Sequence, residues 1–319
     1  MNGIEEKNVQ EENSKLKSEL EMLRIMMNEL ESTNNHLVAA TWRERDLKKQ
    51  LSDAIDEISK SKQLIEVQNR RIEESINYAE RIQRSILPHE ENIKALFSDS
   101  FMLFIPKDKV SGDFPFLCQR NDDIFISVVD CTGHGVPGAL MSLVGHFVLN
   151  ETFTEEIYTP AHLLDYLHEG VKRTLRQEAN KDSRDGMDIA LCKVNLEASL
   201  LEFSGAHRDL LLIRNGELME YKGDKRPIGG TQYKNALPFS NHSIEIQKGD
   251  TIYIYSDGLP DQTGGPEKKK LMNIRVKELL LENNKFEMPV VKGELLREFE
   301  DWKGNTKQID DVLLIGIRF

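Results

Sequence analysis

The chain has 319 residues, a formal net charge of −12 and three cysteines. Its acidic balance argues against nucleic acid as a main partner, because phosphate backbones are bound by clustered Lys and Arg. The cysteines show no CxxC spacing and cannot all pair, which favours a reducing, cytoplasmic compartment; they are Cys118, Cys131 and Cys192. The first residues are acidic and no apolar run approaches the ~20 residues of a spanning helix, so we expect neither a signal peptide nor a membrane segment.

Apolar residues recur at alternating spacings of four and three from Leu16 to Ile86, and the first proline is Pro88. This heptad pattern predicts a long helix that dimerises as a parallel coiled coil over residues 1–72. A solvated single helix and an antiparallel helical hairpin are the alternatives; the first leaves the apolar stripe uncovered, and the second lacks a Gly or Pro turn. Polar residues interrupt the predicted core and weaken it, namely Asn34, Thr41, Glu44, Lys48, Lys62, Asn69 and Gln83.

After Pro88, short apolar segments alternate with turn signals, which is typical of paired strands. Hairpins are indicated at 120–123 and at Asn215-Gly216. Strands are expected at 101–105, 114–118, 124–129, 189–194, 200–203, 210–213, 217–221, 251–255 and 312–317, and helices at about 137–152, 160–178, 269–283 and 289–302. Together they predict a layered α+β domain built on antiparallel sheets.

Residues 133–138 match the Gly-x-Gly-x-x-Gly pattern of dinucleotide sites. We rank that site low, because the preceding strand pairs in a hairpin and the following helix leads into another helix, not a parallel strand. Other hydrolytic chemistries lack their motifs. His89 and His168 have no second His to complete H-E-x-x-H, and there is no G-x-S-x-G.

Four aspartates lie at the edges of predicted strands: Asp113, Asp130, Asp257 and Asp310. Taken singly, an aspartate beside glycine at a strand end is more typical of a plain turn. As an ordered set, the four predict an oxygen-rich cage suited to Mg²⁺ or Mn²⁺. Four buried carboxylates in mutual proximity would repel one another without a cation, so their convergence would itself imply metal.

Six segments resemble, in order, the motifs of the PPM (type 2C) metal-dependent protein phosphatases, most closely the SpoIIE/RsbU branch. They read SGDF, DCTGHGVPGALMSL, GMDIAL, RPIGG, YSDGLPDQTGG and IDDVLLIGI. The resemblance covers about residues 95–319. It implies a serine/threonine phosphatase with a β-sandwich of two antiparallel sheets flanked by helices (αββα) and a centre of two Mn²⁺ or Mg²⁺ ions. It also implies a regulatory or linker helix at 73–94.

Carried over by motif, the resemblance implies that Asp130 bridges both ions and that the carbonyl of Cys131 binds one of them. Asp257 and Asp310 would hold the other ion, and Asp113 would contact the centre directly or through water. A metal-activated water would then attack the phosphoryl group in line, without a phosphoenzyme.

Other candidates carry less weight. His134 is a candidate general acid, although a His at a helix entrance can be purely structural. Asp188 is a candidate for an accessory metal, whereas a solvated turn is the favoured interpretation of Asp185. Arg208 and Arg226 are weak candidates for phosphate binding.

The leading hypothesis is a phosphatase acting on a phosphorylated signalling protein; relatives suggest an anti-sigma-factor antagonist of the STAS type. The geometry of the coil would set the pose of residues 73–87 against the helix that begins near Pro137, and a shift of that helix would alter metal affinity. A catalytically silent coiled-coil scaffold is the rival, because Pro115 stands where the family has an aromatic residue and predicts an edge or bulged strand. A third hypothesis is a coiled-coil adaptor that only binds partners. We expect a homodimer, with neither nucleic acid nor membrane as partner.

Overall fold

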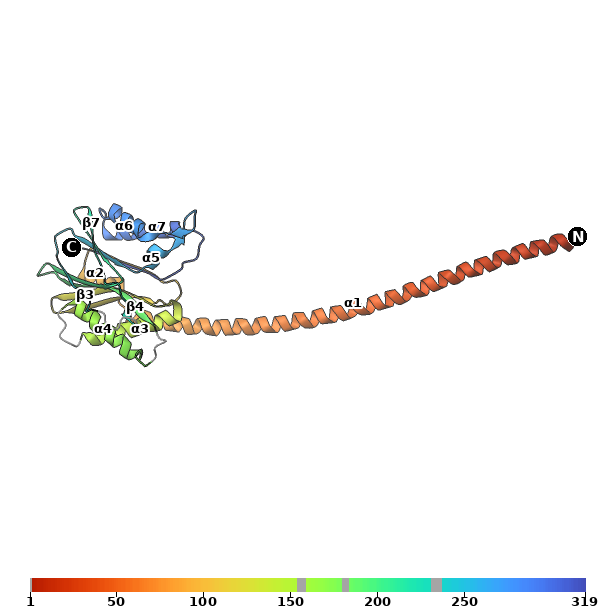
Figure 1. The fold of residues 1–319 in the computed structure, drawn as a ribbon, viewed down its shortest axis with the longest axis horizontal. Coiled ribbons are helices and arrows are strands. Elements are labelled where there is room, and N and C mark those ends of the chain that lie inside the picture. The colour runs from red at the N-terminus through yellow and green to blue at the C-terminus, as the bar shows by residue number, and fades with distance from the viewer. Residues whose placement is uncertain (1, 154–158, 180–183, 231–236) are drawn as a thin grey trace. The chain divides into compact units, whose positions relative to one another are not determined.

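The computed structural model describes residues 2–153, 159–179, 184–230 and 237–319 (Figure 1). The chain divides into two compact units, Met1–Glu73 and Glu74–Phe319. Among the described residues, no helix is both long and apolar enough to cross a membrane.

Helix α1 runs from Asn2 to Ile86 without interruption, which excludes the helical hairpin. It ends just before Pro88, because the residue preceding a proline disfavours the helical conformation. A second helix, α2 (Glu90–Leu96), then begins after the N-cap residue His89. The segment expected as one linker helix at 73–94 is therefore the end of α1 followed by α2.

The second unit contains two antiparallel sheets. One has the spatial order β1 (Ser100–Ile105), β13 (Val312–Arg318), β10 (Thr251–Tyr255), β6 (Leu210–Arg214) and β7 (Glu217–Tyr221). The other has the order β2 (Asp113–Arg120), β3 (Asp123–Cys131), β4 (Gly186–Asn195), β5 (Leu200–Ala206) and β9 (His242–Glu245), with β8 (Ile228–Gly229) paired to β4. A small ribbon joins β11 (Thr263–Gly264) to β12 (Lys269–Lys270).

Because successive side chains along a strand point to opposite faces of its sheet, the apolar residues form three separate cores. Ile126, Val128 and Phe203 of one sheet pack with Ile254 and Ile315 of the other between the sheets. The outer face of the β2–β9 sheet is covered by α3 (Gly135–Thr152) and α4 (Pro160–Thr174). The outer face of the β1–β7 sheet is covered by α5 (Gly258–Asp261), α6 (Met272–Asn283) and α7 (Met288–Lys303) (Figure 1). The predicted αββα arrangement is confirmed.

Each predicted strand and helix is present, with small changes at the ends. Asn215 and Gly216 both have positive φ, 52° and 82°, as the primed hairpin turn requires. Pro115 lies on β2, an edge strand of its sheet, where a missing backbone donor is tolerated. The sequence pattern missed the shortest elements, because two to seven residues carry little periodicity: α2, α5, β8, β9, β11 and β12.

Candidate metal centre

Strand register brings three aspartates together on the β2–β3–β4 side of the sandwich. Asp113 lies opposite Asp130, and Asp130 lies opposite Asp188. Directly opposed residues of an antiparallel sheet project from the same face. Asp130 shares its face with Val128, which belongs to the core between the sheets. The three carboxylates therefore lie at one end of the inter-sheet space.

The second sheet contributes aspartates at the same end. Asp257 follows β10 and Asp310 precedes β13, and these two strands pair antiparallel. Arg208 connects the two sheets: its Nη2 atom lies 2.6 Å from Asp130 Oδ2, 2.7 Å from Asp257 Oδ2 and 3.2 Å from Asp188 Oδ2. One guanidinium nitrogen thus forms ion pairs with three carboxylates, and these belong to both sheets.

Tightly packed loops hold these strand ends in place. Asp311 is buried; its Oδ2 accepts from Gly112 N at 2.8 Å and its Oδ1 from Lys107 N at 2.7 Å. A Cβ at Gly112 would lie 2.4 Å from the carbonyl oxygen of Gly133, and one at Gly138 would lie 2.2 Å from that oxygen. Glycine at these positions lets the backbone of the loop before β2 pack directly against the backbone at the start of α3.

The carboxylates are short of positive charge even with Arg208 among them. Burial, reinforced by Asp130, raises the pKa of Asp113 well above its ordinary value. Burial raises the pKa of Asp130 to about 7; Arg208 opposes this change, and Asp257 and Asp188 add to it. Burial also raises the pKa of Asp310. Desolvation and like charge both disfavour the ionised form, and a further cation would relieve both.

The donor chemistry fits a divalent cation. Asp113 Oδ2 is buried and has no hydrogen-bond partner among the described residues. Carboxylate oxygens are the ligands that Mg²⁺ and Mn²⁺ prefer. As the described side chains are arranged, however, no three His, Cys, Asp or Glu residues form a group that could hold a metal ion. The guanidinium of Arg208 lies among the carboxylates instead.

The remaining predicted residues differ in their contacts. Cys131 ends β3; burial raises the pKa of its thiol well above the ordinary value, which disfavours a thiolate nucleophile. His134 is the N-cap of α3, and its Nδ1 lies 3.1 Å from Asp108 Oδ2. Arg226 pairs with Asp165 at 3.3 Å, and its guanidinium carbon lies 3.6 Å from the ring centroid of Phe239.

Sequence reasoning undervalued Asp188 and Arg208. Asp188 was only an accessory candidate and Arg208 only a weak phosphate candidate, yet the structure joins both to Asp130 and Asp257. Strand register was the available signal for Asp188, since pairing β3 with β4 sets it opposite Asp130. Arg208 gave no comparable signal, because its position depends on how the two sheets pack.

Comparison with known proteins identifies a protein family for this chain. Residues 120–319 match the family model described as Stage II sporulation protein E (SpoIIE). The phosphoserine phosphatase RsbU of Bacillus subtilis (strain 168) is 22% identical over 198 residues, which are 60% of this chain and 54% of RsbU. The chain thus spans about half the length of this curated relative.

Solved structures agree on the fold. The SiaA-PP2C domain of Pseudomonas aeruginosa superposes with a TM-score of 0.71 at 29% identity, covering 79% of this chain and 98% of that domain. The PP2C phosphatase domain of SpoIIE from Bacillus subtilis, solved with a fragment of its regulatory domain, gives a TM-score of 0.55 at 16% identity. That match covers 69% of this chain and 63% of the SpoIIE structure.

The raised pKa of Asp130 predicts a pH dependence of stability in metal-free protein. The folded state holds this proton up to about pH 7, whereas the ordinary value is 3.8. Its contribution is therefore complete below the ordinary value and is lost as the pH rises towards 7. Asp130→Asn cannot ionise, so its stability relative to wild type should rise by up to a few kcal/mol between about pH 4 and about pH 8.

Urea unfolding in EDTA, followed by Trp302 fluorescence in a Trp42→Phe background, measures this difference. Asp122→Asn, at an exposed turn, serves as the matched control and should run parallel to wild type. Parallel pH profiles for Asp130→Asn and wild type would contradict the raised pKa.

Proposed function

The chain belongs to the SpoIIE family of PP2C-type protein serine/threonine phosphatases, and from this we propose that it is a metal-dependent enzyme that dephosphorylates a signalling protein. The observation that carries the proposal is the meeting of Asp130, Asp188 and Asp257 from two sheets at one guanidinium. Beside them lies Asp113 Oδ2, which has no hydrogen-bond partner in the described parts of the chain. A partly buried acidic cluster of this kind is costly for folding alone, which favours a functional reason for it.

In this proposal Asp113, Asp130, Asp257 and Asp310 hold two Mn²⁺ or Mg²⁺ ions together with the carbonyl of Cys131. The bound ions supply charge neutralisation and activate the attacking water. Strand register fixes the positions of the carboxylates. Hydrogen bonds to Asp311 hold the loop before β2 in place.

His134 is proposed as the proton donor to the departing serine or threonine oxygen. Asp108 lies 3.1 Å from its Nδ1 and orients the ring, which leaves Nε2 for the leaving oxygen. The half-exposed position of both side chains keeps them open to a protein substrate.

The substrate is proposed to be a phosphoserine or phosphothreonine of an anti-sigma-factor antagonist of the STAS type. RsbU, with which the chain shares its matched region, is named a phosphoserine phosphatase. The resemblance to the SpoIIE/RsbU branch supports this choice of partner.

Purified protein should hydrolyse a phosphoserine peptide or p-nitrophenyl phosphate with Mn²⁺ and lose that activity in EDTA. Asp130→Asn and Asp257→Asn should each reduce turnover by about 100-fold or more, because each removes a carboxylate from the centre. Asp122→Asn should retain wild-type turnover. Metal-independent turnover, or none from wild-type protein at any Mn²⁺ concentration, would favour the silent scaffold.

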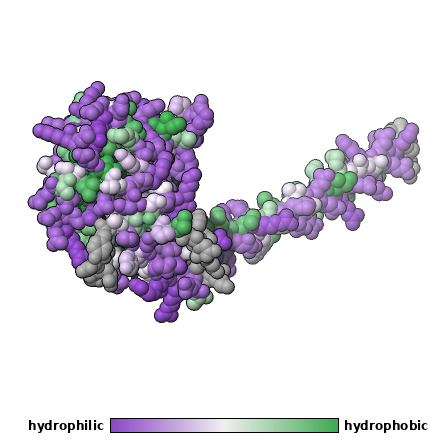
Figure 2. All heavy atoms as spheres, turned by 60° about the vertical axis from the view of Figure 1, so that its left-hand side comes forward, coloured by the Kyte–Doolittle hydropathy of each residue, from purple (hydrophilic) through white to green (hydrophobic). Residues whose placement is uncertain are grey.

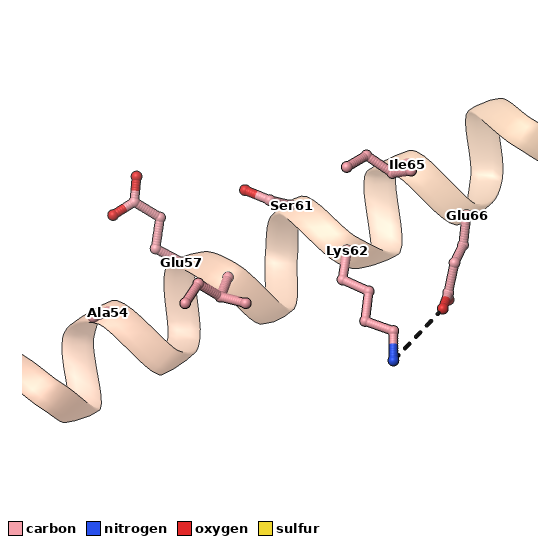
Figure 3. Close-up of a pocket in the computed structure, with 7 residues that line it drawn as sticks. Ala54, Glu57, Ser61, Lys62, Ile65 and Glu66 are labelled. Atoms are coloured by element: carbon pink, nitrogen blue, oxygen red, sulfur yellow. Dashed lines mark ion pairs between the residues drawn. The ribbon is translucent and has the colours of Figure 1, made fainter.

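The N-terminal helix is proposed to dimerise. Hydrophobic side chains are exposed along α1, as Figure 2 shows, including Leu30 at 71%, Ile58 at 67% and Ile65 at 54%. Ile58 and Ile65 are core positions of the predicted heptad, with Lys62 between them; Figure 3 shows Ile65 and the Lys62–Glu66 ion pair of 3.9 Å on this stretch. So long an apolar stripe favours a partner helix, and a second copy offers the same stripe.

Replacing Ile58 and Ile65 together with Ser should shift the protein from dimer towards monomer in sedimentation-velocity experiments. The loss of two apolar pairs from the seam weakens association by about 2–5 kcal/mol. Lys60→Ser with Val67→Ser, which alters outer heptad positions, should leave the dimer intact. A monomeric wild-type protein would contradict the coiled coil.

The end of α1 is proposed to regulate the centre. Within the second unit Gln83 is buried; its Nε2 donates to Ser111 O at 2.7 Å and to Ser142 Oγ at 2.9 Å, and its Oε1 accepts from Ser111 N at 3.1 Å. Ser111 Oγ in turn accepts from Asp113 N at 3.0 Å. This chain of contacts links the end of α1 to a proposed ligand and, through Ser142, to α3.

Gln83→Ala should raise the Mn²⁺ concentration needed for half-maximal turnover several-fold, because losing buried hydrogen bonds costs about 1–3 kcal/mol and loosens the segment before Asp113. Ser85→Ala, an exposed change on the same turn, should have no effect. Removing residues 1–70 tests the same link by taking away most of the predicted coiled coil. Unchanged metal dependence in both Gln83→Ala and the truncated chain would argue against regulation through this helix.

A further inference from the structure

Arg208 occupies the position at which the acidic cluster needs positive charge. Its Nη2 lies within 2.7 Å of Asp130 and Asp257, two of the carboxylates that the proposed function assigns to the metal ions. Its side chain is only 15% exposed. A guanidinium and a divalent cation that compete for the same carboxylate oxygens repel each other, so the two cannot be held there together.

The guanidinium satisfies this cluster incompletely. Arg208 Nε is buried and lacks a hydrogen-bond partner among the described residues, as does Asp113 Oδ2. A buried donor or acceptor without a partner costs free energy. One positive charge also faces three carboxylates within 3.2 Å, so negative charge remains uncompensated. The arrangement is therefore stable enough to form and yet open to replacement by an ion of higher charge.

The backbone at Arg208 is held in place by its neighbours. The residue lies in the short connection between β5 and β6, where His207 N donates to Asp224 O at 2.8 Å. A Cβ at Gly205 would lie 2.1 Å from Arg208 O, and one at Gly223 would lie 2.4 Å from it. The connection is thus packed against two glycine backbones, and any exchange of cations must move the guanidinium, not the loop.

We propose that Arg208 is an internal competitor of the divalent cations: its guanidinium neutralises the metal-free cluster and must leave Asp130 and Asp257 before metal binds there. This inference rests on the proposed function and adds a residue that sets the metal affinity of the centre. Arg208 acts on the carboxylates that bind the metal and not on the substrate. It keeps the metal-free domain folded and raises the metal concentration at which the centre is filled.

Isothermal titration of metal-free protein with Mn²⁺, without substrate, measures this competition. Arg208→Gln should bind Mn²⁺ about tenfold more tightly than wild type, because no cation has to be displaced. The metal-free variant should melt at a lower temperature than wild type, and saturating Mn²⁺ should raise its Tm by more. Arg297→Gln removes an equal charge from the exposed face of α7 and should match wild type in both measurements.

Unchanged or weaker Mn²⁺ binding by Arg208→Gln would overturn the inference. An increase in KM for phosphopeptide with unchanged Mn²⁺ affinity would do so as well, because it would place Arg208 on the substrate. If Arg208→Gln does not fold without metal, Arg208→Lys decides: tighter Mn²⁺ binding than wild type supports competition, and equal or weaker binding refutes it. Wild-type protein that neither binds Mn²⁺ nor turns over would refute the proposed function itself.

Discussion

Carboxylates gathered at one end of a β-sandwich need positive charge, and much of the second unit is organised around that need. Asp113, Asp130 and Asp188 are aligned by strand register, and Asp257 and Asp310 come from the facing sheet. Burial and repulsion between neighbouring carboxylates raise the pKa values of Asp113, Asp130 and Asp310. Arg208 offsets part of that repulsion, but its own Nε and Asp113 Oδ2 stay buried without a hydrogen-bond partner among the residues that the structure describes. The energetic cost of the cluster supports the proposal that it serves chemistry.

The fold maintains this strained arrangement through its backbone. Inter-sheet packing of large apolar residues sets the distance between the strand ends, so the carboxylates cannot move apart to reduce their repulsion. Close contacts among Gly112, Gly133 and Gly138 hold the loop before β2 against the start of α3, and Asp311 anchors it by two backbone hydrogen bonds. The strand ends and loops around the carboxylates are thus fixed through their backbones.

One apolar stripe along α1 faces two different environments. In the first unit its residues are exposed and suit a second helix. In the second unit Ile76 and Ala79 are partly covered and Gln83 is buried against Ser111 and Ser142. Gln83 interrupted the predicted heptad core as a polar residue, and its hydrogen bonds explain why a polar side chain is favoured there. The proposed regulation therefore uses the same helical periodicity as the proposed dimer.

The sequence by itself determined the long helix and the longer strands through periodicity, and its ordered motifs determined the family and, through it, the αββα layers. Both kinds of signal are local properties of the chain. It also predicted Asp113, Asp130, Asp257 and Asp310 as a set, since each stands at a strand edge. Only the tertiary structure decided that Asp188 joins them and that Arg208 lies among them. Strand register and the packing of two sheets set those positions, and both arise from contacts between residues far apart in the chain.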